Sequence, residues 1–228
     1  MVFVPLHDEN PLRVIRLQLM TAAIIFVSAL VFIIFGGVSG SEAVLAADVG
    51  YGVVPAELLN LNRTAPAALN PVAEPLTLLT YMFFHAGWLH LLSNMAFLWV
   101  FGDNVEDAFG HFGFLLFYLL CGIAGALAHV TMYPASQDPL VGASGALSGV
   151  IASYFLLYPR AKILVLAYVV PIRLPAFIVL GGWIALQVLS LRSTSPEVQG
   201  VAWWAHIGGF AAGFILTALL RSRLLVRG

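Results

Sequence analysis

Six apolar stretches dominate this sequence and constrain its fold more than any other feature. An α-helix needs about 20 mostly apolar residues to cross the ~30 Å hydrocarbon core of a bilayer. The second and fourth stretches are shorter than the others. The six run over residues 17–35, 88–101, 112–132, 144–158, 175–191 and 201–220. The sequence therefore predicts an all-α integral membrane protein built as a bundle of six transmembrane helices.

Composition excludes several other classes of protein. Of the 228 residues, 61% are hydrophobic and 9% are charged, whereas soluble domains are about 25% charged. This excludes a water-soluble globular fold. Ten basic and eleven acidic residues give a net charge of −1, so there is no basic surface for phosphates and we expect no nucleic acid partner. The single cysteine, Cys121, excludes an intrachain disulfide and a cysteine-based zinc site.

The distribution of Arg and Lys predicts the orientation. With six spans both termini lie on one side of the membrane, and eight of the ten basic residues fall on that side. The positive-inside rule makes it the cytoplasmic side. We therefore expect a cytoplasmic N-terminal tail over residues 1–16, a membrane domain over 17–220 and a basic cytoplasmic tail over 221–228. Residues 1–16 do not resemble a cleaved signal peptide.

Two connecting segments are apolar but unsuited to spanning. About fifty residues between the first two stretches are rich in Gly and Ala and are interrupted by prolines. They predict a long, partly membrane-embedded loop on the outer side. Residues 163–171 follow the basic residues Arg160 and Lys162, and Arg173 closes them off. They predict an interfacial loop.

Four polar side chains inside the predicted spans need a structural or functional reason. They are His90, Asn94, Ser144 and His206. His90 and Asn94 are four residues apart, so they share one helical face. At 1.5 Å per residue, Asn94, Ser144 and His206 lie at a similar depth, roughly 6 to 9 Å below the outer surface. This common depth predicts that the four meet in one site.

Ser144 lies in the sequence VGASGA, at the predicted start of a helix. The first N–H groups of a helix have no intrahelical partner and favour negative charge. They can stabilise the oxyanion that forms when a serine attacks a carbonyl, with Asn94 and His90 as further donors. His206 is the candidate base. Because no Asp or Glu lies in the outer halves of these helices, we expect a Ser-His dyad.

Small residues indicate how the helices of Ser144 and His206 could meet. Gly145 and Gly149 follow the serine, and Gly209 and Gly213 follow the histidine. Both pairs have the small-xxx-small spacing that lets transmembrane helices approach closely. Close packing would bring the two side chains within hydrogen-bond reach, about 2.6 to 3.2 Å.

Each of these residues also has a structural interpretation. Ser144 alone is more often a helix N-cap than a nucleophile, and Asn94 alone could be an interhelical hydrogen-bonding residue. A lone intramembrane histidine such as His206 could be a packing residue. His85 and His90 could be metal ligands, but a spacing of five does not stack them on one helical face and no HExxH motif is present. We therefore expect no metal and no cofactor.

Four motifs in order along the chain resemble those of the rhomboid intramembrane serine proteases of the bacterial six-helix type. The resemblance covers most of residues 76–220. The motifs are HAGWLHLLSN from His85 to Asn94, GxxxExxxG around Glu106, GASG around Ser144, and AHxGGxxxG from Ala205 to Gly213. In the outer loop many members carry a Trp-Arg pair where this chain has AEPL at residues 73–76, so the resemblance does not extend to that loop.

The resemblance implies a role for each motif residue. Ser144 would be the nucleophile and His206 the general base and later the general acid. The N–H of Ser144, with Asn94 and His90, would form the oxyanion hole. Structural support would come from His85, Glu106, Gly142, Gly145, Gly209 and Gly213.

The resemblance also implies a substrate and a location. Substrates would be single-pass transmembrane proteins, cleaved near the outer face of a bacterial cytoplasmic membrane in contact with its lipids. Two other functions stay open. A non-catalytic rhomboid-like protein could bind or escort transmembrane clients, although the intact serine and histidine argue against it. A small transporter or proton path is disfavoured because the spans show no repeated halves.

Overall fold

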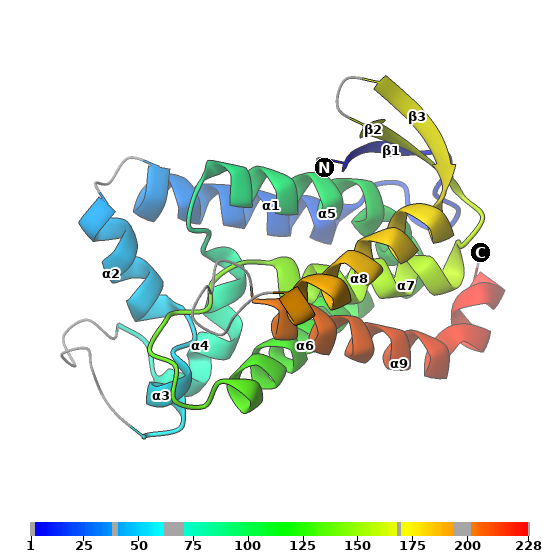
Figure 1. Cartoon of the computed structure of the whole chain (residues 1–228). Helices are drawn as coiled ribbons and strands as arrows, with labels where there is room; N and C mark the ends of the chain where they lie inside the picture. The colour runs from blue at the N-terminus through cyan, green and yellow to red at the C-terminus, as the bar shows by residue number, and fades with distance from the viewer. Residues whose placement is uncertain (1–2, 38–40, 62–70, 168–169, 194–201, 228) are drawn as a thin grey trace.

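The computed structural model describes residues 3–37, 41–61, 71–167, 170–193 and 202–227, and this part of the chain is mostly helical (Figure 1). Each predicted apolar span overlaps one helix. These helices are α1 (Leu19–Val31), α5 (Trp88–Phe109), α6 (His111–Met132), α7 (Ser144–Leu157), α8 (Ala176–Ser193) and α9 (Trp203–Arg227). Two of them, His111–Met132 and Trp203–Leu224, are long and apolar enough to cross a membrane by length and composition. The apolar helices Leu19–Phe35, Ser144–Leu157 and Ala176–Leu189 are shorter.

The segment between α1 and α5 is broken into short helices. The π-helical turn Phe32–Gly37 follows α1 directly. Then come α2 (Ser41–Tyr51), α3 (Pro55–Leu58), α4 (Glu74–Thr80) and the 3₁₀ turn Tyr81–Phe83. Pro55 and Pro75 stand in the first turns of α3 and α4, where proline's missing N–H costs nothing.

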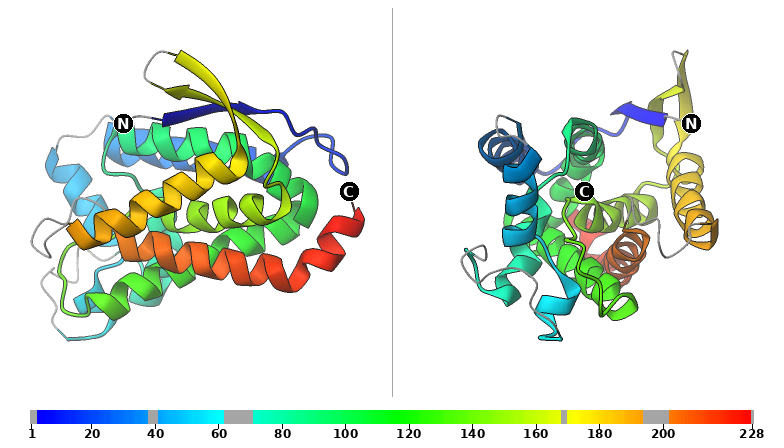
Figure 2. Two further views of the ribbon diagram at one scale, coloured as in Figure 1. Left: turned by 45° about the vertical axis from the view of Figure 1, so that its right-hand side comes forward. Right: turned by 60° about the vertical axis from the view of Figure 1, so that its left-hand side comes forward.

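Helix α7 is the centre of the bundle. Eleven of its fourteen residues are buried, and α5, α6, α8 and α9 all contact it. Figure 2 shows α8 at the edge of the bundle, next to α7 and α9. A short helix can therefore be buried over most of its length by longer neighbours.

Helices α7 and α9 touch backbone to backbone. A Cβ atom added to Gly209 would lie 1.9 Å from the carbonyl oxygen of Gly145, and one added to Gly213 would lie 2.4 Å from the Cα atom of Gly149. No side chain fits at these distances. The small-xxx-small spacing on both helices therefore corresponds to a contact that only glycine allows.

A three-stranded antiparallel sheet lies beside the helices. Its strands are β1 (Phe3–Asp8), β2 (Lys162–Ala167) and β3 (Val170–Pro175), in the order β1-β2-β3. Strand β3 leads directly into α8, so the sheet joins the N-terminal segment to that helix (Figure 1).

The sheet corrects two predictions: the fold is not all-α, and the described part of the predicted loop, residues 163–167 and 170–171, forms strands. Ile163 and Val165 are buried and Lys162 is exposed, which is the alternation of a strand. The residues at 162–166 are K-I-L-V-L. Because all but the first are apolar, the sequence does not show which side chains face inward. The pairing partner β1 comes from the other end of the chain, where local sequence cannot indicate it.

The two predicted tails are also structured. The N-terminal tail contains β1, and the hydroxyl of Tyr154 in α7 donates a 2.5 Å hydrogen bond to the carboxylate of Asp8. The carboxylate of Asp107 accepts hydrogen bonds of 2.7 to 3.0 Å from the backbone N–H groups of residues 13–15. At the other end, α9 continues through Arg227.

Helix α5 extends beyond its predicted apolar span because its polar last turns are paired. Glu106 accepts hydrogen bonds from the backbone N–H groups of Met20 and Thr21 at 2.9 and 2.8 Å. These groups lie in the first turn of α1, where backbone donors are unpaired and the helix dipole favours an anion. Glu106 therefore joins α5 to α1 at the opposite end of α5 from His90.

The glycine contact generates a prediction about stability. The change Gly213→Ala forces the backbones of α7 and α9 apart, and overpacking of this kind costs on the order of 1 to 3 kcal/mol. We expect a lower midpoint of thermal unfolding in detergent micelles. The matched control is Gly113→Ala in α6, where the added Cβ would meet its nearest atom at 3.5 Å. Equal effects of the two changes would contradict the packing argument.

Candidate active site

Ser144 and His206 lie within hydrogen-bond distance of each other. The Nε2 atom of His206 is 2.8 Å from the Oγ atom of Ser144. Ser144 is the first residue of α7, and His206 lies in the first turn of α9. The two helices begin side by side because their glycines allow the backbones to touch. The histidine is buried, at 7% exposed, and the serine is partly buried.

Tyr81 and His85, which precede α5, and His90, in the first turn of α5, contact the loop that precedes Ser144. The backbone N–H of Gly142 donates to the carbonyl oxygen of Tyr81 at 2.9 Å, and the N–H of Ala143 points to His85 Nε2 at 3.5 Å. Gly142 has a φ of +124°. A Cβ atom there would lie 2.7 Å from the ring of His90, so glycine is required both by the backbone conformation and by this contact.

The predicted oxyanion residues are only partly gathered around Ser144. The ring of His90 lies against Gly142, two residues before the serine, and its centroid is 5.1 Å from that of His85. The Nδ2 atom of Asn94 donates to the backbone carbonyl of His90 at 2.8 Å. That bond uses one of the two N–H groups of the amide, so the other can serve a further acceptor.

The remaining predicted residues lie around this site or at a distance from it. A Cβ atom added to Gly145 would be 3.0 Å from the hydroxyl oxygen of Tyr81, which itself donates to the carbonyl oxygen of Gly122 at 2.7 Å. Gly209 and Gly213 form the contact between the two helices. Glu106 belongs to the joint with α1 and is not brought to the site.

Sequence reasoning missed one polar residue, Gln187 of α8. Its Oε1 atom is 3.0 Å from Nδ1 of His206, on the side of the ring away from the serine. The rings of Trp183 and Trp203 flank the same imidazole at centroid distances of 5.9 Å. The signal was present, since Gln187 is an amide inside an apolar stretch like Asn94. The prediction of a dyad rests on the absence of Asp and Glu, and an amide partner does not contradict it.

Ser148, one turn after Ser144 in α7, has a structural contact. The hydroxyl of Ser148 donates to the backbone carbonyl of Ser144 at 2.6 Å, so it is tied to its own helix. Among the described residues no group of three His, Cys, Asp or Glu side chains could hold a metal ion.

Comparison with known proteins identifies the family. The family model described as Rhomboid domain matches residues 72–223. The chain belongs to the rhomboid family. It is 32% identical over 156 residues to Rhomboid protein 1, mitochondrial, of Saccharomyces cerevisiae, covering 63% of this chain and 41% of that protein. It is 33% identical over 144 residues to Rhomboid protease GluP of Bacillus subtilis, covering 63% of this chain and 25% of that protein.

A plant relative has a similar level of identity. Rhomboid-like protein 11, chloroplastic, of Arabidopsis thaliana is 31% identical over 154 residues, covering 62% of this chain and 51% of that protein. The matched regions thus span from a quarter to about half of these relatives. The rhomboid family is a family of membrane proteins of intramembrane-protease type. The relatives named here are a mitochondrial, a chloroplastic and a bacterial protein.

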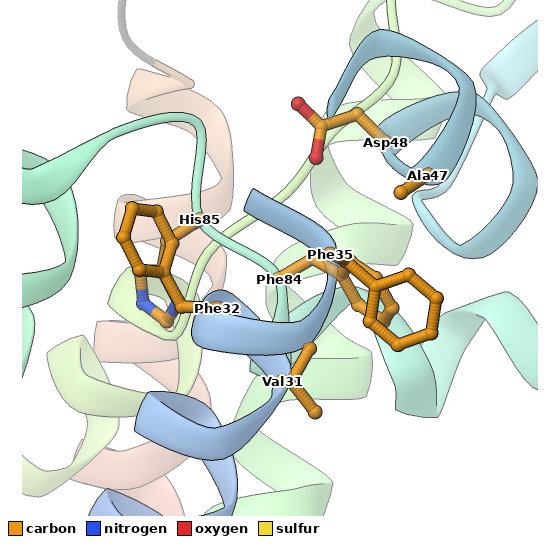
Figure 3. A pocket seen from close by; sticks show the side chains of 7 residues that line it. All are labelled: Val31, Phe32, Phe35, Ala47, Asp48, Phe84 and His85. Carbon is orange, nitrogen blue, oxygen red and sulfur yellow. The ribbon is translucent and has the colours of Figure 1, made fainter. Parts of the chain in front are cut away.

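A small pocket lies next to His85, on the side of the segment between α1 and α5 (Figure 3). Its walls come from the end of α1, from α2 and from the residues before α5. The lining residues are Val31, Phe32, Phe35, Ala47, Asp48, Phe84 and His85. The Asp48 carboxylate is turned toward this largely apolar space from α2 (Figure 3). Burial raises the pKa of the Asp48 carboxyl from 3.8 to about 6.

The raised pKa of Asp48 generates a prediction about pH and stability. Because the folded state keeps the proton to higher pH than the unfolded state, the free energy of unfolding falls as pH rises between about 4 and 6. The uncharged variant Asp48→Asn removes this fall. In detergent micelles, we measure the midpoint of thermal unfolding of the variant minus that of wild type. This difference should be larger at pH 7 than at pH 4.

The control for this experiment is Asp138→Asn, because Asp138 is exposed. It should follow the wild-type pH dependence. A pH dependence of Asp48→Asn that matches wild type would contradict the assigned role of the buried carboxyl.

Proposed function

We propose that this chain is an intramembrane serine endopeptidase that cleaves single-pass transmembrane proteins near the outer face of the membrane. The observation that carries the proposal is the 2.8 Å contact between His206 Nε2 and Ser144 Oγ at the start of a buried helix. Its support is the membership of the rhomboid family, in which the Bacillus subtilis relative is named a protease.

The geometry suits acyl transfer in two steps. Ser144 Oγ attacks the carbonyl carbon of the substrate peptide bond while His206 Nε2 takes the hydroxyl proton. His206 then gives this proton to the leaving amine nitrogen as the C–N bond breaks. Water attacks the resulting acyl-serine ester, His206 takes a proton from that water, and the proton returns to Ser144 Oγ as the ester bond breaks.

The start of α7 is suited to the negative charge that forms in each step. Ser144 is the first helical residue, so its backbone N–H and those just after it have no partner within the helix. The helix dipole adds a favourable potential at the same point. We assign the oxyanion to the N–H of Ser144, the free N–H of Asn94 and the ring of His90.

We propose that six helices span the membrane, with both termini in the cytoplasm and the site open to the outer side. Helix α7 runs from Ser144 to Leu157, and the basic residues Arg160 and Lys162 follow it, Lys162 as the first residue of β2. Arg173 lies in the same sheet. Basic residues thus gather at the end of α7 opposite the serine, as the positive-inside rule requires. The segment with α2, α3 and α4 then lies on the outer side, partly embedded, and the membrane is a bacterial cytoplasmic membrane.

A substrate helix must expose its peptide carbonyls before Ser144 can attack one. Backbone carbonyls in a continuous helix are already hydrogen-bonded. Residues that weaken a helix, such as Gly and Pro, should therefore favour cleavage where they lie near the scissile bond.

The first test is cleavage of a tagged single-pass substrate by purified protein in liposomes. Ser144→Ala and His206→Ala should each lower kcat on the order of 10⁴-fold, because the two groups act as a unit. Ser144→Ala should also abolish covalent labelling by a fluorophosphonate.

Matched controls are Ser93→Ala and His7→Ala, since both side chains are exposed. These variants should cleave like wild type. Cleavage that survives Ser144→Ala would reject the assigned nucleophile. Binding of intact substrates with no cleavage by wild type would favour the non-catalytic, client-binding alternative.

The oxyanion assignment generates a separate prediction for Asn94. Removing one oxyanion donor typically lowers kcat by 10²- to 10³-fold. We expect Asn94→Ala to lower kcat by about this factor with little change in KM, measured by initial rates over a range of substrate densities in the bilayer. An unchanged kcat would mean that Asn94 serves only its bond to the carbonyl of His90.

A further inference from the structure

We propose that Gln187 of α8 is the positioning residue for His206, holding the imidazole in the tautomer and orientation that make it a base. This inference rests on the proposed function and extends it to a third helix. Gln187 does not touch the reacting atoms and acts only through the histidine.

The argument starts from the protons of a neutral imidazole. Such a ring carries one N–H, and its other nitrogen is an acceptor. To take the hydroxyl proton of Ser144, Nε2 must be the unprotonated nitrogen, so the proton must sit on Nδ1. The Oε1 atom of Gln187 lies 3.0 Å from Nδ1. An amide oxygen can only accept, so this contact favours the required tautomer.

Both partners of this contact are buried, so the hydrogen bond is needed to satisfy their polar groups. Gln187 and His206 are both 7% exposed, and a buried amide without a hydrogen bond is costly. Leu186 and Leu189, its neighbours on α8, are 56% and 60% exposed. Helix α8 therefore turns this amide inward and these two leucines outward, the reverse of the usual arrangement in a water-soluble helix.

A second contact from the same helix fixes the ring plane. Trp183 lies four residues before Gln187, so both are on one face of α8. Its ring is inclined at 35° to that of His206, at a centroid distance of 5.9 Å. The hydrogen bond sets the direction of Nδ1 and the tryptophan limits tilting of the ring.

The consequence is that the base depends on the position of α8. This helix lies at the edge of the bundle (Figure 2), whereas α7 and α9 are locked together by glycine contacts. A shift of α8 away from α9 separates Gln187 Oε1 from Nδ1, while the hydrogen bond between Ser144 and His206 spans only α7 and α9. Gln187 is thus the link between the edge helix and the reacting pair.

The kinetic test compares two replacements of Gln187. Gln187→Leu keeps a similar side-chain volume but has no acceptor. We expect kcat to fall about 10- to 100-fold, because the variant loses a part of what general base catalysis contributes. KM should be nearly unchanged. Gln187→Glu keeps an acceptor oxygen at the same reach in either protonation state and should restore most of kcat. Leu189→Ala, on the outer face of α8, should match wild type.

A purely structural role for Gln187 predicts a different pattern. It would lower the midpoint of thermal unfolding and change KM along with kcat. Equal kcat values for Gln187→Leu and wild type, or a loss of activity that Gln187→Glu does not restore, would overturn the proposal.

A second measurement does not require proteolysis. In protein with ¹⁵N-labelled histidine, the imidazole resonances report the tautomer, and those of His206 are assigned by their loss in His206→Asn. We expect the Nδ1-protonated tautomer in wild type and a mixture of tautomers in Gln187→Leu. The same mixture in both proteins would reject the role of Gln187. A pure Nδ1 tautomer in a wild type that cleaves nothing would reject the proposed function and leave the hydrogen bond standing.

Discussion

The backbone contact between α7 and α9 is the constraint on which the site depends. A Cβ atom on Gly209 would lie 1.9 Å from the carbonyl oxygen of Gly145, so the helix separation is set by the absence of side chains. Only at that separation do the first turns of the two helices bring Ser144 Oγ to 2.8 Å from His206 Nε2. Because both residues stand at helix starts, the contact also places unpaired backbone N–H groups beside the nucleophile.

Two clusters of buried polar groups in this protein have different roles. Near the start of α7, amide and imidazole side chains surround the serine and supply hydrogen-bond donors and acceptors. At the far end of α5, carboxylates pair with backbone N–H groups of the N-terminal segment and of α1. A polar side chain in an apolar bundle is costly unless it is paired, so both clusters fix the helices that contribute to them. The first cluster contains the groups of the proposed reaction. The second joins α5 to α1 and to the N-terminal segment.

The sheet adds a connection that the helices alone do not provide. Strand β1 pairs with β2, and β3 leads directly into α8. The N-terminal segment is also fixed to α7 by the bond between Tyr154 and Asp8. Helix α8 is thus anchored at its start by the sheet, and along its length it contacts His206 through Trp183 and Gln187. The base of the proposed reaction is aligned by a helix whose beginning is held by strands from both halves of the chain.

The sequence by itself determined the membrane class, the approximate helices and the serine and histidine that meet in the site, because apolar length, helical spacing and the cost of buried polar groups are local properties. Ser144, His206 and the glycines that let their helices touch were visible in this way. Only the tertiary structure decided the pairing of β1 with β2, since its two strands are far apart in the chain and their apolar residues show no alternation of polarity. It alone also decided that the amide of Gln187 faces His206, because an apolar helix of nearly uniform composition does not reveal which side it turns inward.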